Sequence, residues 1–284
     1  MLKRVITALV AVIILLPVLW LSNTYVFPAA IAIVTIISLY EMFSCLGFKR
    51  KFSVTFPAYI IGIALPFVGK LSGDVGTILP FICAAMLMYI LYLMMIAVFN
   101  HDKYSLNELA MCYMTAIYII SGFSSIQFIR DMSTENNIYL LVFIGAWVTD
   151  IFAYFTGMLF GKHKLCEAIS PKKTVEGSIG GILFCALAFA LFVVFALDTE
   201  VTLWKCAVLA VAGIIISIVS QIGDLSMSLI KRHYGIKDFG KIFPGHGGML
   251  DRFDSIIAVA LTLFILISAL RAYFDIELFV WAGK

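Results

Sequence analysis

The chain has 284 residues, of which 63% are hydrophobic and only 13% are charged, and its mean hydropathy is +1.06. This composition excludes an ordinary soluble domain, in which about a quarter of the residues are charged. The formal net charge of +3 is too small to indicate nucleic-acid binding, so the informative question is where the 20 Lys and Arg residues lie along the chain.

Apolar segments of membrane-spanning length recur from the N-terminus onward. A hydrocarbon core about 30 Å thick requires about 20 helical residues. We therefore predict an all-α polytopic membrane protein with about nine transmembrane helices. They lie at residues 5–21, 25–44, 54–69, 75–99, 109–128, 138–160, 178–197, 201–223 and 255–274. The third is short and contains Pro57, Gly62 and Pro66, which is compatible with a kinked or partial span.

The first apolar run also resembles a secretory signal, because Lys3 and Arg4 precede it. A second apolar run follows almost at once, and no A-x-A-like site closes the first, so we interpret it as an uncleaved span. Cations gather at 3–4, 49–51, 103, 162–173 and 231–252, in alternate loops. Since cytoplasmic loops carry excess Lys and Arg, these loops and the N-terminus are predicted to be cytoplasmic and the C-terminus external.

Two of the basic loops carry more than positive charge, and the first is Ser170–Gly177, with the sequence SPKKTVEG. Pro171 is compatible with the start of a helix, Ser170 and Thr174 offer hydroxyl groups, and Lys172 and Lys173 add cations. A helix N-terminus with these groups would bind phosphate. A positive-inside anchor with capping residues explains the segment equally well.

The second loop, Ser228–Asp254, concentrates ionisable residues and glycines between two apolar spans. An ionisable group at bilayer depth costs roughly 2.5–3.5 kcal/mol on insertion scales, so such a concentration indicates a membrane-boundary site for a highly charged ligand. Within it, Pro244–Gly248 forms a turn whose amides could approach an anion, although any short connection also needs glycine. His246 could donate to a phosphate, transfer a proton or only brace the turn.

Three carboxylates in this region are candidate Mg²⁺ ligands. Asp251 and Asp254 are three residues apart and share one helix face, and a hairpin would bring Asp224 to the same level. Mg²⁺ prefers oxygen ligands and completes its shell with water and substrate phosphates. Salt bridges to Arg232 or Arg252 are the alternative for each acid alone, but three acids beside a glycine turn favour metal.

Two other acids lie inside predicted spans. Asp150 could line a polar cavity or pair with a lysine of another helix, and Glu41 is expected to face the headgroup layer.

At these residues the chain resembles the phosphatidate cytidylyltransferase family, also called CDP-diacylglycerol synthases. The family pattern combines a serine, a Lys-Arg pair, a Lys-Asp pair, His-Gly-Gly and Asp-Arg-x-Asp at fixed spacings. The positions that satisfy it are Ser228, Lys231, Arg232, Lys237, Asp238, Gly240, Pro244, His246, Gly247, Gly248, Asp251, Arg252 and Asp254. Residues 170–174 look like a second hallmark of the family, whereas 1–145 agree only in being apolar spans. We treat 1–284 as one polytopic domain whose catalytic part is 146–284.

The resemblance implies that CTP and phosphatidate react to give CDP-diacylglycerol and pyrophosphate, at the cytoplasmic face of the cytoplasmic membrane. It implies Mg²⁺, with room for a second metal ion, on Asp224 and Asp251 with Asp254 in support. The expected catalytic residues are Lys231, Arg232, Lys237, Asp238, His246 and Arg252. The expected substrate-binding residues are Ser170, Lys172, Lys173, Thr174, Gly247 and Gly248.

Rival interpretations are a CTP-dependent polyprenol kinase, a cytidylyltransferase for an ether lipid and an anionic-solute transporter. A kinase would release CDP instead of pyrophosphate. A transporter predicts paired broken helices in two halves, and the sequence shows no such symmetry. A homo-oligomer is compatible with the sequence.

Overall fold

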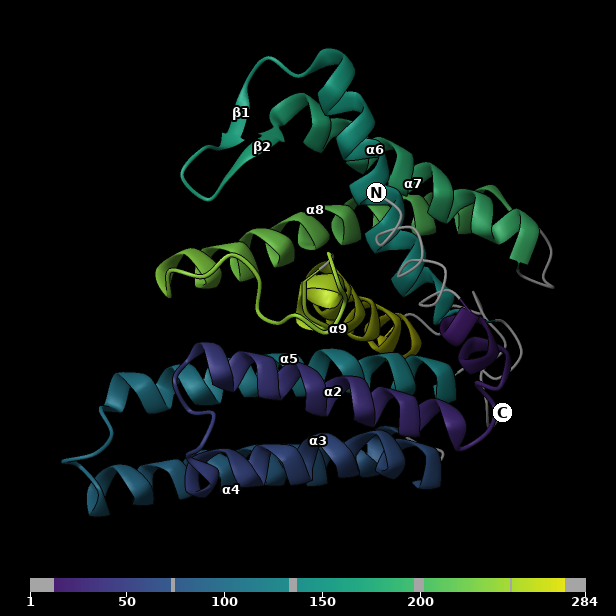
Figure 1. The fold of residues 1–284 in the computed structure, drawn as a ribbon. Coiled ribbons are helices and arrows are strands. Elements are labelled where there is room, and N and C mark those ends of the chain that lie inside the picture. Colours follow the sequence, from purple (N-terminus) through teal and green to yellow (C-terminus); the bar gives the residue numbers. More distant parts are fainter. Residues whose placement is uncertain (1–12, 73–74, 133–136, 197–201, 246, 274–284) are drawn as a thin grey trace. The chain divides into compact units, whose positions relative to one another are not determined.

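The computed structural model describes residues 13–72, 75–132, 137–196, 202–245 and 247–273, and it is almost entirely helical (Figure 1). The helices are α2 (Val26–Cys45), α3 (Phe52–Ser72), α4 (Val75–Phe99), α5 (Leu106–Met132), α6 (Leu140–Phe160), α7 (Val175–Ala196), α8 (Leu203–His233) and α9 (Leu250–Tyr273). Two short strands, β1 (Lys164–Cys166) and β2 (Ser170–Thr174), form an antiparallel hairpin between α6 and α7.

Eight helices within the described residues are long and apolar enough to cross a membrane, which confirms an all-α polytopic membrane protein. The first predicted span lies partly outside those residues, and the described backbone is helical over 13–20. The third span is a helix of 21 residues that passes through Pro57 and Pro66, so it is full-length. The eighth continues ten residues beyond the predicted end, to His233. Which terminus faces the cytoplasm stays a prediction.

The chain divides into two compact units, and the first contains residues up to Met132 together with Tyr234–Phe253. Helices α2, α3 and α5 pack against one another, and α4 packs on α3 and α5. The interior is apolar, with Leu39 and Met42 of α2 and Ile120 and Phe123 of α5 all fully buried. This helix bundle is the support on which the segment after α8 folds.

The second unit contains Ser133–His233 and the chain from Asp254 onward. Helix α7 packs closely on both α6 and α8. The approach of α7 to α8 depends on Gly213, since a Cβ there would lie 2.8 Å from Ala186 Cα and 2.9 Å from the Cys185 carbonyl oxygen. Thr149 of α6 also donates a 2.9 Å hydrogen bond to Ser217 of α8. Small residues and buried hydroxyls therefore set the helix spacing here, as is usual in membranes.

The segment around Pro171 differs from its prediction. It is strand β2 and not the start of a helix, because α7 begins only at Val175. The Thr174 hydroxyl accepts the Gly177 amide at 3.1 Å and so caps the helix. Glu176 in the first turn accepts the amides of Lys162 and His163 at 3.1–3.3 Å, which fastens the hairpin to the helix. The helix start at Pro171, with which the sequence was compatible, is therefore not observed.

We predict that Gly213→Val destabilises the second unit, because the added methyl groups would meet the backbone of α7. Overpacking of this kind costs about 1–3 kcal/mol of unfolding free energy. Thermal unfolding in detergent would measure it, with Val211→Leu as control, since Val211 lies on the same helix with 57% of its surface exposed. An equal melting temperature for Gly213→Val and the wild type would contradict this account of the helix contact.

Candidate active site

The segment between α8 and α9, here called the signature loop (Tyr234–Met249), is held by the carboxylate at the start of α9. Asp251 Oδ2 accepts hydrogen bonds from the amides of Phe239 at 2.8 Å and Gly248 at 2.9 Å, and the residue is buried. The Phe243 amide bonds to the Gly247 carbonyl oxygen at 2.9 Å. Gly247 has φ +89°, which favours glycine. Backbone hydrogen bonds therefore tie the described residues of the loop to the first turn of α9.

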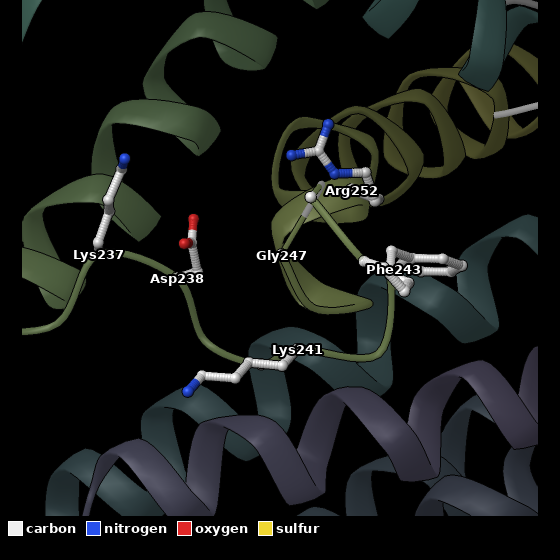
Figure 2. Close-up of a pocket in the computed structure, with 9 residues that line it drawn as sticks. Lys237, Asp238, Lys241, Phe243, Gly247 and Arg252 are labelled. Carbon is white, nitrogen blue, oxygen red and sulfur yellow. The ribbon is translucent and has the colours of Figure 1, made fainter. Parts of the chain in front are cut away.

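A cavity of about 690 Å³ lies on this loop, within the range of small-molecule sites. Its lining residues are Lys237, Asp238, Gly240, Lys241, Phe243, Pro244, Gly245, Gly247 and Arg252. Figure 2 shows the side chains of Lys237, Asp238 and Arg252 extending to the same side of the loop, whereas Lys241 extends to the other. Three cations against one carboxylate, together with glycines, suit a polyanionic ligand. The predicted His246 lies outside the described residues.

Glu41 was expected in the headgroup layer, and that expectation was wrong. Its residue surface is only 3% exposed, and its carboxylate accepts the amides of Met249 at 3.0 Å and Leu250 at 2.8 Å. The carboxylate thus binds the end of the signature loop and the start of α9. A single acid near the end of an apolar helix gave a weak signal, because partners more than 200 residues away do not show in the sequence.

Carboxylates and lysines are paired in the second unit. Lys173 Nζ of β2 lies 2.5 Å from Asp224 Oδ2 of α8, and Lys231 Nζ lies 4.0 Å from Asp254 Oδ2 of α9. The Ser228 hydroxyl also contacts Asp224 Oδ1 at 3.5 Å. Asp224 and Asp254 therefore each have a lysine partner, a pairing that was not predicted from the sequence. An unpaired charge buried between apolar helices would cost desolvation free energy, and each of these ion pairs offsets part of that cost.

Asp150 belongs to the same group. It interacts electrostatically with Asp224 and Lys173 and hydrogen-bonds to Ser255. Asp254 in turn interacts with both other acids. Three carboxylates from α6, α8 and α9 thus repel one another beside lysines, an arrangement in which an added divalent cation would be stabilised.

The donor set of these acids fits a magnesium ion that also binds substrate. Carboxylate oxygens are the ligands that Mg²⁺ prefers, usually one or two per ion beside water and phosphate. Across the described residues, no three His, Cys, Asp or Glu side chains are grouped closely enough to hold a metal by themselves. Asp224 would have to exchange its bond to Lys173, and Asp251 Oδ2 already holds the loop. The metal roles of Asp224, Asp251 and Asp254 stay predictions.

A second cavity, of about 360 Å³, lies in the second unit between β2 and the helices. Its lining residues are Asp150, Ala153, Tyr154, Gly157, Met158, Leu165, Ser170, Lys172, Lys173, Thr174, Gly177, Ser178 and Gln221. Cations and hydroxyls of β2 form one side. Tyr154 and Met158 of α6 form another, and they are 66% and 59% exposed on a helix surface rich in exposed apolar side chains. The cavity therefore joins a cationic wall to a lipid-facing apolar one.

The predicted site residues fall into two groups, one in each unit. Lys237, Asp238, Gly247 and Arg252 line the first cavity, and Gly248 binds Asp251 beside it. The four residues predicted from the Ser170–Thr174 segment all line the second cavity. Lys231 and Arg232 are in the last turn of α8, where Lys231 pairs with Asp254. Asp150 was left open from the sequence, and it lines the second cavity.

Comparison with known proteins identifies the family of this chain. The model of the Cytidylyltransferase family matches residues 2–270. Phosphatidate cytidylyltransferase of Staphylococcus haemolyticus is 35% identical over 265 residues, which cover 93% of this chain and 98% of that protein. The enzyme of the same name from Staphylococcus aureus strain COL is 36% identical over 266 residues, with the same coverage. The chain therefore belongs to the cytidylyltransferase family, and it is a nucleotidyltransferase embedded in a membrane.

Proposed function

We propose that this protein transfers CMP from CTP to phosphatidate, forming CDP-diacylglycerol and releasing pyrophosphate. The similar proteins are named for phosphatidate and cytidylyl transfer. The observation that carries the proposal is the presence of two cationic cavities of different character. The first is lined by glycines and charged groups, and the second combines lysines with a lipid-facing wall. A water-soluble nucleotide needs a polar cavity, whereas a lipid phosphate needs cations beside an apolar surface that faces the membrane.

The cavity on the signature loop is assigned to CTP. A triphosphate carries several negative charges on adjacent groups, and Lys237 and Arg252 extend to one side of the loop (Figure 2). Gly240, Gly245 and Gly247 in the lining leave the backbone accessible to phosphate oxygens. His246, within this turn, stays a proposed phosphate or proton donor. The cavity volume of about 690 Å³ suits a nucleotide.

The second cavity is assigned to phosphatidate. Lys172 and Lys173 would bind the phosphate, assisted by the hydroxyls of Ser170 and Thr174, which line the same cavity. Tyr154 and Met158 would contact the first part of the acyl chains, since both are exposed on the outer face of α6. A lipid could then bind without leaving its leaflet. Lys231 and Arg232 would bind phosphates of either substrate.

The chemistry needs charge neutralisation more than proton transfer. The phosphate of phosphatidate is already an anionic nucleophile, and it must approach the α-phosphate of CTP, which is also anionic. Lysine and arginine side chains lower this repulsion and stabilise the departing pyrophosphate. Mg²⁺ on Asp224, Asp251 or Asp254, with a second ion where the substrate recruits one, would supply further charge stabilisation. Because CTP is cytosolic, catalysis is assigned to the cytoplasmic face of the cytoplasmic membrane.

The first prediction of this proposal concerns the reaction itself. With α-labelled CTP, phosphatidate and Mg²⁺, the purified protein in detergent should move label into the lipid fraction and release pyrophosphate, and EDTA should stop it. Release of CDP without labelled lipid would indicate a kinase instead. A demonstrably folded protein that labels no lipid with varied metals and detergents would refute the proposed substrate.

The two assignments predict opposite kinetic effects at two lysines. Lys237→Ala should raise the KM for CTP about tenfold, because a charged hydrogen bond contributes roughly 1.5–3 kcal/mol, and should leave the KM for phosphatidate within about twofold. Lys172→Ala should raise the KM for phosphatidate about tenfold and leave the KM for CTP within about twofold. Lys103→Ala is the matched control, since this exposed lysine lies outside both cavities. If both variants altered the KM of the same substrate, the division between cavities would be wrong.

Asp224→Asn should lower kcat by about 100- to 1000-fold, the loss typical of removing one electrostatic group from an active site. The substitution keeps the size of the side chain but removes the charge that would bind metal and that pairs with Lys173. Size-exclusion and thermal-unfolding measurements would show that the variant is folded. Asp102→Asn is the control, since that carboxylate is 87% exposed. Near-normal turnover of Asp224→Asn would refute the metal assignment.

A further inference from the structure

Glu41 caps a helix that lies far from it in the sequence. Leu250 is the first residue of α9, and the first amides of a helix have no partner within it. Glu41 accepts the amides of Met249 at 3.0 Å and Leu250 at 2.8 Å, one on each carboxylate oxygen. A local Ser, Thr or Asp usually performs this role. Here the cap comes from α2, 208 residues earlier in the chain, so it joins the start of α9 to the helix bundle of the same unit.

The same carboxylate lies against two bends of the signature loop. A Cβ on Gly240 would overlap Glu41 Oε1, and a Cβ on Gly248 would overlap both carboxylate oxygens. Only glycine leaves room for the acid at these two positions. Gly240 also lines the cavity assigned to CTP. The position of Glu41 therefore determines how closely the loop packs onto α2.

Two acids thus hold the loop and the start of α9 through four backbone amides. Asp251 accepts those of Phe239 and Gly248, and Glu41 accepts those of Met249 and Leu250. The two carboxylates also repel each other electrostatically. Two negative charges can remain close in a buried site because amide donors and the positive end of the α9 dipole compensate them. The loop conformation and the two charges therefore depend on each other.

We infer that Glu41 is a positioning residue for the nucleotide site. Its carboxylate does not line the cavity assigned to CTP, but it fixes the loop that carries Lys237, Asp238 and Gly240 and the helix start that carries Arg252. Displacing positioned groups by about 1 Å can lower a rate by about 100-fold. The inference rests on the proposed function for the assignment of this cavity to CTP and for the kinetic measurement.

Neither conservative replacement reproduces this arrangement. Glutamine has the same size, but its NH₂ group would face one of the two amide donors and its neutral side chain would not compensate the helix end. Aspartate keeps the charge but is one methylene shorter, so it could not reach both amides from the same backbone position. Glu41→Gln is therefore the sharpest single substitution.

The test compares Glu41→Gln with Glu108→Gln. Glu108 accepts the Ser105 amide at 3.0 Å near the start of α5, so the control makes the same chemical change at another helix start of the same unit. Glu41→Gln should lower kcat/KM for CTP by about 10- to 100-fold, with the KM for phosphatidate within about twofold. Amide hydrogen exchange should accelerate over residues 237–252. Glu108→Gln should change neither measurement.

A purely structural role gives different results. If Glu41→Gln lost activity only in proportion to the unfolded fraction, with an unchanged KM for CTP, the inference would be overturned. If the wild type transferred no CMP, the proposed function would fail, but exchange over 237–252 would still decide this inference, and an unchanged rate in Glu41→Gln would refute it.

A double-variant comparison tests the glycine contact separately. Gly240→Ala should raise the KM for CTP in the wild-type background, because its methyl group would displace the Glu41 carboxylate. In a Glu41→Ala background, which removes that carboxylate, adding Gly240→Ala should cause little further loss. Equal losses in both backgrounds would show that contact with Glu41 is not the reason for glycine at position 240, and would count against the inference.

Discussion

The structure depends on the compensation of charge within an apolar chain. Only 13% of the residues are charged, and several acids in the described helices have partners close enough to offset part of their desolvation. Glu41 and Asp251 each accept two backbone amides, whereas Asp224 and Asp254 pair with lysines. A buried carboxylate of the first kind fixes backbone. One of the second kind can exchange its lysine for another cation. The described part of the chain therefore uses similar acids for two purposes.

The acids bound by backbone amides therefore differ in role from the acids paired with lysines. Releasing these backbone amides would disturb the segment that carries them, so Glu41 and Asp251 maintain the shape of the signature loop, whatever further role Asp251 has in binding metal. Lysine side chains can rotate away, so the group of Asp150, Asp224, Asp254, Lys173 and Lys231 would be able to rearrange on binding the anionic substrate or metal ion proposed above. In the same way, the glycines of the loop serve two needs. Gly247 supplies a left-handed backbone, and Gly248 leaves room for Glu41.

Under the proposed function, two cavities of different character would allow one fold to bind substrates from different phases. The strand β2 and the outer face of α6 place lysines beside side chains exposed to lipid. The signature loop provides a polar cavity on short, glycine-rich backbone. Both cationic segments follow the rule that basic residues gather at membrane boundaries. Side chains of each segment also line a cavity, and a segment that only anchored the chain at the membrane surface would not need one. The Ser170–Thr174 segment lines a cavity, and its role in binding phosphate stays a proposal.

The sequence by itself determined the membrane class, the helix positions to within a few residues for most spans, and the two segments that line cavities, because apolar length and the clustering of charge are local properties. It did not determine that Ser170–Thr174 is a strand, since Thr174 caps α7 and Glu176 holds the hairpin through contacts with Lys162 and His163. It also did not reveal Glu41. Hydrogen bonds between residues 208 positions apart leave no periodic pattern, so only the tertiary structure could bring that carboxylate to the start of α9.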